Sequence, residues 1–264
     1  MKVTLLSHTP NPEQTVAAAA KLCYSAAGVE DILEGLTPEK TASFVEMLSE
    51  IGHESPIEHA SFTFAIEGVS RALLAQITRH RIASYSVQSQ RYVREKDFDY
   101  VMPPEIAGIP EAKELFLEAM EESGRYYNKL TSILQKAHTA SFLAQGKDEK
   151  EAKRLAGKKA IEDARFVLPN ACDTKMVVTM NARSLYNFFK HRLCNRAQWE
   201  IRQVAYQMLS LCLGVAPTLF AKAGPPCING SCPEGKMSCR RMAEVREKMD
   251  KLRREASVTG ETRE

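Results

Sequence analysis

The sequence predicts an α+β fold, mostly helical, in which helices pack on a mostly antiparallel sheet in a single domain. The 264 residues fit one large folding unit, and the 44% apolar content suffices for a sizeable core. Short segments with strand patterns are separated by long segments with helical spacing, and the chain shows no internal repeat.

Three segments have strand patterns. Lys2–Leu6 is a short apolar run, and apolar residues alternate with small ones along Ser61–Val69. Thr174–Thr179 is rich in β-branched residues, which favour strands. The polar segment Ser84–Tyr92 lacks a helical period, so we expect an ordered loop or an irregular strand there.

Helices are expected in the first third of the chain wherever a capping residue precedes a periodic segment. Asn11-Pro12 introduces Glu13–Tyr24, and Thr37-Pro38 starts a helix with apolar residues at helical spacing. Ser70 is a candidate cap for a helix from Arg71 to about His80.

The later segments predict longer helices. Pro110 to about Leu143 gives one or two of them, and Lys147–Val167 gives another, which Pro169 stops. Asn181 is expected to cap a helix that runs to about Leu193, and Gln198–Leu213 is the last core helix.

The composition changes after Gly224. A Pro-, Gly- and Cys-containing loop is followed by the highly charged segment Met237–Arg254. We therefore expect a main domain over residues 1–223 and, over 224–264, a tail that is dispensable for catalysis. Its cysteines, Cys227, Cys232 and Cys239, permit a zinc or iron–sulfur site, but their spacing favours a redox-sensitive or plain surface segment.

Bulk properties restrict the class of protein. A net charge of +3 argues against general nucleic-acid or membrane-surface binding. No stretch approaches the ~20 apolar residues of a membrane span, and the N-terminus has too short an apolar run for a signal peptide. An odd count of seven cysteines, with Cys23, Cys172, Cys194 and Cys212 in apolar segments, indicates reduced core thiols in a cytoplasmic protein.

The densest cluster of polar side chains is Gln76–Tyr92, with the sequence QITRHRIASYSVQSQRY. Gln76, Arg79 and His80 share one helical face, while Arg81 follows Ile77 by four residues and is expected to point inward. A buried arginine is costly unless it meets an anion such as a phosphate. The alternative is a helix C-terminus whose basic residues complement the helix dipole.

This segment resembles a known family. Arg79-His80-Arg81, followed after seven residues by Ser89, is similar to the RHR-x7-S signature of flavin-dependent thymidylate synthases. Three further segments match that family, and together the matching segments cover about residues 18–213: His53-Glu54-Ser55-Pro56-Ile57-Glu58-His59, Asp163-Ala164-Arg165-Phe166-Val167-Leu168-Pro169, and Asn181-Ala182-Arg183-Ser184-Leu185-Tyr186-Asn187 with its continuation to Glu200.

The resemblance implies two sets of ligand-binding residues. The FAD-binding set is His53, Ser55, Arg79, His80, Arg81, Asn181, Arg183 and Asn187. The dUMP-binding set is Gln76, Arg79, Gln88, Ser89, Gln90, Arg91, Arg165 and Arg192. Arg192 also has the catalytic role, as a fixed cation beside the uracil ring, and Arg183 and Asn187 are expected on a different helix face from Arg192.

The implied activity is the reductive methylation of dUMP to dTMP, with 5,10-methylenetetrahydrofolate as carbon donor and NADPH or NADH as reductant through FAD. Such a methyltransferase is expected to be a homotetramer with shared active sites. The sequence has no Gly-rich dinucleotide loop, so side chains and helix ends must hold FAD. Cys23 and Val87 depart from residues found in some family members, so we assign them no role.

Other interpretations remain open from the residues alone. His53 and His59 lie six apart with Pro56 between them, which argues against a helical metal site, and we expect no metal; a capped turn without a ligand is the plain alternative. A nucleic-acid-binding module would use the arginines as phosphate contacts. A metal-dependent nucleotide hydrolase would use His53, His59 and His80, although the sequence lacks an accompanying Asp cluster.

Overall fold

The computed structural model describes residues 1–90 and 99–260, with side chains described to residue 256. It confirms the α+β class: helices predominate, and four strands form one sheet in the order β1-β2-β4-β3. Strand β1 (Lys2–His8) pairs antiparallel with β2 (Ser61–Ser70), and β4 (Asp173–Asn181) lies between β2 and β3 (Ser84–Val87). The segment expected as a loop or irregular strand therefore begins as a sheet strand.

Two compact units divide the chain. Unit 1 contains Met1–Glu67, Gln76–Ser86 and Met176–Glu264, and unit 2 contains Gly68–Ala75 and Val87–Lys175. The tail after residue 223 belongs to unit 1, while the boundary at residue 224 stays a prediction.

The N-terminal helices of unit 1 are α1 (Pro12–Leu22), α2 (Val29–Glu34) and α3 (Pro38–Ile51), followed by the 3-10 turn η1 (Pro56–His59). Thr37 caps α3 as expected, by accepting a hydrogen bond from the Lys40 amide. Asn11 does not cap α1 with its side chain, because its backbone adopts the left-handed conformation with φ of 44°. Pro12 alone provides the start signal there.

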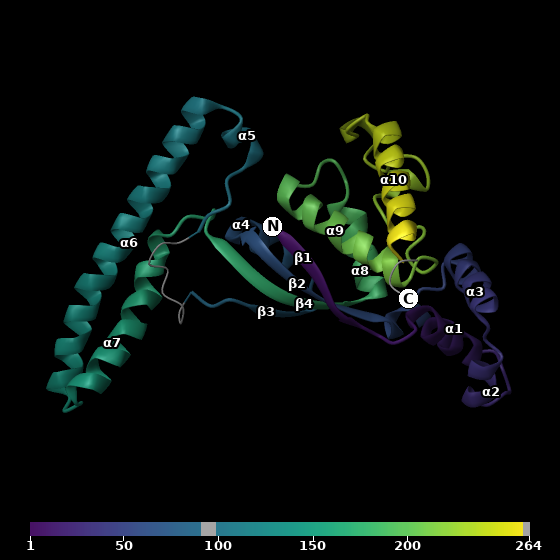
Figure 1. Cartoon of the computed structure of the whole chain (residues 1–264), viewed down its shortest axis with the longest axis horizontal. Coiled ribbons are helices and arrows are strands. Elements are labelled where there is room, and N and C mark those ends of the chain that lie inside the picture. The colour runs from purple at the N-terminus through teal and green to yellow at the C-terminus, as the bar shows by residue number, and fades with distance from the viewer. Residues whose placement is uncertain (91–98, 261–264) are drawn as a thin grey trace. The chain divides into compact units, whose positions relative to one another are not determined.

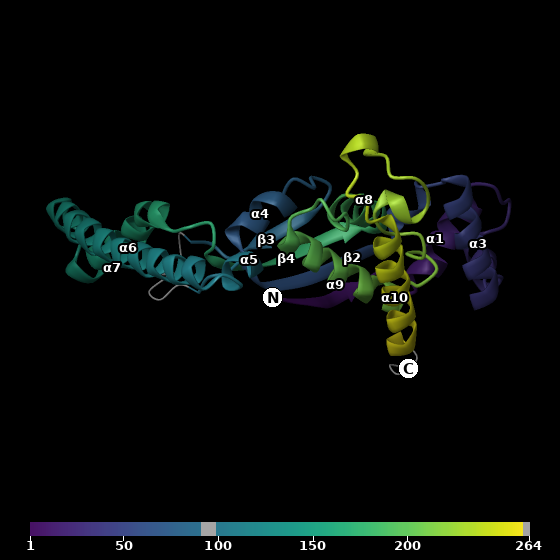
Figure 2. The ribbon, with the colours of Figure 1, turned by 90° about the horizontal axis from the view of Figure 1, so that it is seen from above.

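The C-terminal helices of unit 1 are α8 (Ala182–Arg192), α9 (Trp199–Val215) and α10 (Met242–Gly260). Asn181 caps α8 as expected, because its side chain accepts from the Ser184 amide at 2.9 Å. Helix α9 packs beside β1, and α10 packs on α9 (Figures 1 and 2). The tail thus contributes to the core of unit 1, where Met249 is fully buried.

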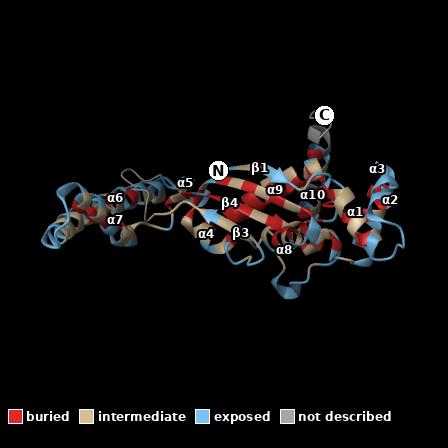
Figure 3. Cartoon of the chain, turned by 90° about the horizontal axis from the view of Figure 1, so that it is seen from below, coloured by how far each residue is buried: buried red, intermediate tan, exposed pale blue. Residues whose placement is uncertain are grey.

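The core of unit 1 lies between the strands and helices α8 and α9. Figure 3 shows buried residues along β2, β4 and the inner faces of these helices. Phe220 is central: its ring lies 5.2 Å from that of Phe62, 6.1 Å from that of Phe189 and 5.8 Å from that of Tyr186. This aromatic cluster fixes α8 against β2, and α8 in turn positions polar residues at its own C-terminal end.

Unit 2 contains α4 (Arg71–Ile77, whose last two residues belong to unit 1), α5 (Pro104–Ala107), α6 (Pro110–Ala144), α7 (Glu149–Ala164) and the 3-10 turn η2 (Arg165–Val167). The segment expected to form one or two helices is a single helix of 35 residues, α6. It lies side by side with α7 (Figure 1), where Tyr127 packs on Ile161 and Ala164. Helix α4 ends at Ile77, three residues before the expected end.

No helix in the described part of the chain is long and apolar enough to cross a membrane. All seven cysteines are free. Cys172 and Cys212 are buried, in line with the expectation of core thiols, but Cys23 is exposed at the end of α1.

Candidate functional site

Four residues of the expected site line a pocket of about 650 Å³ in unit 1, and three of them are basic or imidazole side chains. Arg79 and His80 reach it from the segment after α4, and Asn187 and Arg192 reach it from α8. The rest of its lining is Lys190, His191, Cys194, Arg196, Ala197, Pro225, Pro226, Cys227, Cys232, Pro233 and Glu234. We call this space the cationic pocket.

Arg192 and His80 form a direct hydrogen bond in this pocket, although they are far apart in the chain. Arg192 Nε donates to His80 Nε2 at 3.1 Å, and Arg192 Nη2 donates to the Gln76 carbonyl at 3.2 Å. Because an arginine only donates, His80 Nε2 must be unprotonated, which places the proton of the neutral ring on Nδ1. The three remaining N–H groups of Arg192 have no partner among these contacts.

The environment of His80 keeps its ring neutral. Burial, the Arg192 guanidinium and His191 together lower the pKa of His80 from 6.5 to about 4. The ring also lies 5.0 Å from that of Phe188 in an edge-to-face arrangement. His80 therefore acts as an acceptor that holds Arg192 in place.

The segment around His80 is fixed by Tyr85. The Tyr85 hydroxyl lies 2.7 Å from the Ile77 carbonyl oxygen, which also accepts from the His80 amide at 3.1 Å, and 3.0 Å from the His80 carbonyl oxygen, so it ties together the turn that follows α4. Burial raises the pKa of Tyr85 to about 12, which keeps this donor protonated.

The cationic pocket has an excess of positive charge. Its lining contains Arg79, Lys190, Arg192 and Arg196, and Glu234 is the one carboxylate among the described lining residues. Glu234 already pairs with Arg196 at 2.5 Å. Burial and the neighbouring Arg79 lower the pKa of Arg192, which means that its charged form lacks compensation. An anionic ligand would supply that compensation.

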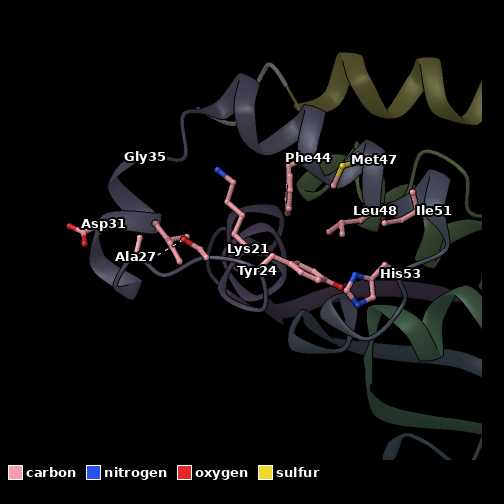
Figure 4. A pocket seen from close by; sticks show the side chains of 12 residues that line it. Lys21, Tyr24, Ala27, Asp31, Gly35, Phe44, Met47, Leu48, Ile51 and His53 are labelled. Carbon is pink, nitrogen blue, oxygen red and sulfur yellow. Dashed lines mark hydrogen bonds between the residues drawn. The ribbon is translucent and has the colours of Figure 1, made fainter.

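His53 and Ser55 are a second pair of expected residues. His53 lies at the end of another pocket, of about 480 Å³, lined by residues of α1, α2 and α3. His53 Nε2 lies 3.1 Å from Ser55 Oγ, and the ring of Tyr24 reaches toward that of His53 with centroids 6.2 Å apart (Figure 4). Phe44 and Leu48 of α3 give this pocket its apolar wall. The arrangement suits a planar ring better than a phosphate.

Arg183 lies at the start of α8 and is held by two carboxylates of the segment after α3. It forms an ion pair with Glu58 and another with Glu54 at 3.2 Å. These exposed pairs connect α8 to η1 and orient the guanidinium. Asn181 uses its side-chain oxygen to cap α8, which leaves its amide N–H groups for a ligand.

Four of the expected residues that the structure describes belong to unit 2. The Gln88 backbone is anchored, since its carbonyl accepts from Arg71 at 2.9 Å and its amide donates to Lys175 at 3.0 Å. Ser89 and Gln90 follow directly and are half-buried. Arg165 lies in η2 with its guanidinium 5.8 Å from the Phe166 ring. Arg91 falls outside the described residues.

One geometric expectation was wrong. Arg81 is exposed rather than inward-pointing, because α4 ends at Ile77 and the helical period does not extend to it. Asn187 and Arg192, which were expected on different faces of α8, both line the cationic pocket.

Sequence reasoning missed several residues of the cationic pocket, namely Lys190, His191, Cys194, Arg196 and the tail residues of its lining. The run Lys190-His191-Arg192 in the last turn of α8 was an available signal, because it gathers more basic side chains at one helix end than complementing the dipole requires. Among residues 1–90 and 99–260, no three His, Cys, Asp or Glu side chains are arranged to hold a metal ion.

Comparisons with known proteins cover most of the chain, including the residues of both pockets up to position 218. Positions 4–218 match the family described as thymidylate synthase complementing protein. A protein of Clostridium tetani named flavin-dependent thymidylate synthase is 56% identical over 246 residues, which is 93% of this chain and 96% of the relative. Proteins of the same name from Geobacter sulfurreducens and Pyrococcus furiosus are 46% identical over 260 residues (98% of this chain, 100% of the relative) and 38% identical over 243 (89% and 90%).

Proposed function

The chain belongs to the family of flavin-dependent thymidylate synthases, and from that premise we propose that it converts dUMP to dTMP. The reaction takes its one-carbon unit from 5,10-methylenetetrahydrofolate, and its reductant is NADPH or NADH. When bound, FAD supplies the hydride that the reductive methylation needs. The feature of this chain that carries the proposal is the uncompensated Arg192 guanidinium, fixed by neutral His80 in the cationic pocket.

The residues present fit a dinucleotide cofactor. Arg79 and Arg192 of the cationic pocket form no ion pair with a carboxylate among the residues that the structure describes, which suits the pyrophosphate of FAD, and His80 Nδ1–H is a further donor. The Tyr24–His53 pair offers ring surfaces for a planar group. We assign FAD binding to His53, Ser55, Arg79, His80, Arg81, Asn181, Arg183 and Asn187.

We assign the electrostatic activation of the substrate to Arg192. Carbon C5 of uracil becomes nucleophilic as negative charge builds on N3 and O4, and a fixed cation stabilises that charge. The guanidinium is pre-oriented because His80 and the Gln76 carbonyl already hold two of its N–H groups, so little reorganisation is needed. It remains protonated and therefore acts as an electrostatic activator rather than a base.

We assign dUMP binding to Gln76, Arg79, Gln88, Ser89, Gln90, Arg91, Arg165 and Arg192. Arginines suit the phosphate because they bind it with two parallel hydrogen bonds, and the amides and hydroxyl suit the polar edges of uracil and deoxyribose. The fixed Gln88 backbone supports the assignment of its side chain and of the two residues that follow.

We further propose a cytoplasmic homotetramer. Unit 2 supports the oligomer: Leu115, Tyr126 and Ile133 of α6 are exposed at 67%, 49% and 56%. Their spacing of eleven and seven residues puts them on one helical face, a stripe that a partner chain would cover. Light scattering should give four chains per particle, and Ile133→Glu should reduce that number; a monomeric wild-type protein would refute the oligomer.

The test of the activity is dTMP formation by the purified protein with dUMP, methylenetetrahydrofolate and reduced nicotinamide. Arg192→Ala should lower kcat by roughly 100- to 1,000-fold, the effect of removing one fixed stabiliser of developing charge. Arg125→Ala is the matched control, because Arg125 is an exposed helical arginine paired only with Glu122 in its described ion pairs. A wild-type protein without dTMP formation, or an active Arg192→Ala variant, would refute the assignment.

A further inference from the structure

The tail loop after residue 224 contributes much of the lining of the cationic pocket. Pro225, Pro226, Cys227, Cys232, Pro233 and Glu234 line it together with Arg79 and Arg192. We call residues 225–234 the wall loop. The composition of the sequence predicted that this loop belongs to a tail that is dispensable for catalysis. The loop nevertheless lines the pocket that contains the Arg192 guanidinium, to which we assign catalysis.

The wall loop is anchored to the core of unit 1 through α10. Arg246 donates to the Cys227 carbonyl from Nε at 2.9 Å and to the Gly230 carbonyl from Nη2 at 2.9 Å. Arg253 Nη2 donates to the Ala223 carbonyl at 3.3 Å, directly before the loop. Because Val245 and Met249 bury α10 against the core, these hydrogen bonds fix the loop backbone.

The entrance to the wall loop requires glycine. Gly224 has φ of 150°, and a Cβ at this position would lie 2.6 Å from Ile228 Cδ1. The side chain of Ile228 thus lies against Gly224, whose backbone conformation other residues rarely adopt. At the other end of the loop, the Glu234–Arg196 ion pair attaches it to the connection between α8 and α9.

The pocket therefore has two chemically different sides. One presents the cations Arg79, Lys190 and Arg192, and the wall loop presents mainly prolines and thiols, which carry no fixed charge. A phosphate beside Arg79 and Lys190, with the adjoining sugar and ring between Arg192 and the neutral side, satisfies both and keeps Arg192 beside the ring.

We propose that the wall loop forms one side of a nucleotide-phosphate site and that Cys232 limits the room for the nucleotide. This proposal rests on the proposed function, which supplies two nucleotides with the same chemistry, dUMP and FAD. Cys194 and Cys232, both half-buried in the lining, are then covered when the site is filled.

Protection from alkylation tests the proposal without turnover. The full-length protein, with its flavin and after flavin removal, is treated with iodoacetamide, and each cysteine is followed by peptide mass spectrometry. dUMP or FAD should slow labelling of Cys194 and Cys232 at least ~10-fold at saturating ligand, since occupancy then exceeds about 90%. Cys239, outside the pocket lining, is the internal control, and deoxyuridine without phosphate should not protect.

The ligand that protects identifies the occupant. Protection by dUMP alone assigns the wall to the substrate, and protection by FAD alone assigns it to the cofactor. Unchanged labelling of both thiols with both ligands, at concentrations at which each is shown to bind, overturns the proposal.

A steric variant gives a second, independent readout. Cys232→Phe should raise the KM for dUMP or the Kd for FAD roughly tenfold or more, because a bulkier side chain occupies ligand space, a change worth about 1.4 kcal/mol. Cys239→Phe, in the same tail but outside the lining, should leave both constants unchanged. A folded Cys232→Phe variant with wild-type constants refutes the wall, whereas a wild-type protein that makes no dTMP refutes the proposed function instead.

Discussion

Neutral His80 is the acceptor that fixes Arg192, and the Arg192→Gln substitution tests this relation directly. The substitution removes the positive charge beside the imidazole but leaves the burial of His80 and the neighbouring His191 in place. Protonation of His80 then becomes easier, so its pKa should rise. It should not return to 6.5, because burial is the largest cause of the lowered value.

The size of the rise follows from Coulomb's law and the order of the causes. A unit charge about 4 Å away contributes roughly 1 kcal/mol in bulk water and ~4 kcal/mol at an effective dielectric constant of 20. One pKa unit corresponds to 1.36 kcal/mol, so removing an interaction of roughly 1 kcal/mol would raise the pKa of His80 by about 0.7. Burial is the largest cause of the fall from 6.5 to about 4, so Arg192, a smaller cause, accounts for less than half of it. We expect a pKa for His80 near 5 in the variant, a rise of roughly 1.

The measurement is an NMR titration of the protein labelled with ¹³C at histidine Cε1, in which His80→Gln identifies the His80 signal among six histidines. Arg196→Gln is the control, because Arg196 lines the same pocket but is not among the causes of the His80 shift. A wild-type pKa near 6.5, or an equal rise in the Arg192→Gln and Arg196→Gln variants, would refute the adjacent Arg192 charge as a cause of the lowered pKa of His80.

Three other perturbations have defined outcomes. Because the pKa of His80 is lower in the folded state, the unfolded state binds more protons between pH 6.5 and 4, and the free energy of unfolding falls as the pH drops through that window. The loss at pH 5 should be roughly 1 kcal/mol after solvent screening. Denaturant unfolding measures this loss, which should be absent in His80→Gln. Asn181→Ala removes the cap of α8, and Thr37→Ala removes the cap of α3, so each should lower the free energy of unfolding by about 0.5–2 kcal/mol. Only Asn181→Ala should also weaken FAD binding, measured by fluorescence. Phe188→Ala empties a fully buried site beneath His80 and should cost about 3–5 kcal/mol in the same unfolding assay, and a loss below 1 kcal/mol would contradict the packing described.

The elements that the sequence predicted are those governed by neighbours in the chain. Asn181 and Thr37 act as caps because the amides they accept from lie three residues away. The alternation in β2 and the long apolar period of α6 also depend on local spacing. Arg81 was misplaced because the helical period was extended past Ile77, where α4 ends and the Tyr85 hydroxyl donates to the Ile77 carbonyl.

The features that sequence reasoning could not supply depend on long-range packing. Arg192 and His80 are 112 residues apart, and only the aromatic packing of α8 brings them within hydrogen-bonding distance. The wall loop reaches the same pocket because α10 docks on α9, and composition gave no sign of that docking. The family signature identified residue types for ligands, but it did not indicate which of them share one pocket.

The visible absorption spectrum of the purified protein, followed during reduction by NADPH with and without dUMP, tests the central claim most directly. We expect flavin bands that bleach faster when dUMP is present, and dTMP once methylenetetrahydrofolate is added. A colourless protein that binds no FAD when supplied with it, and forms no dTMP, would contradict the account.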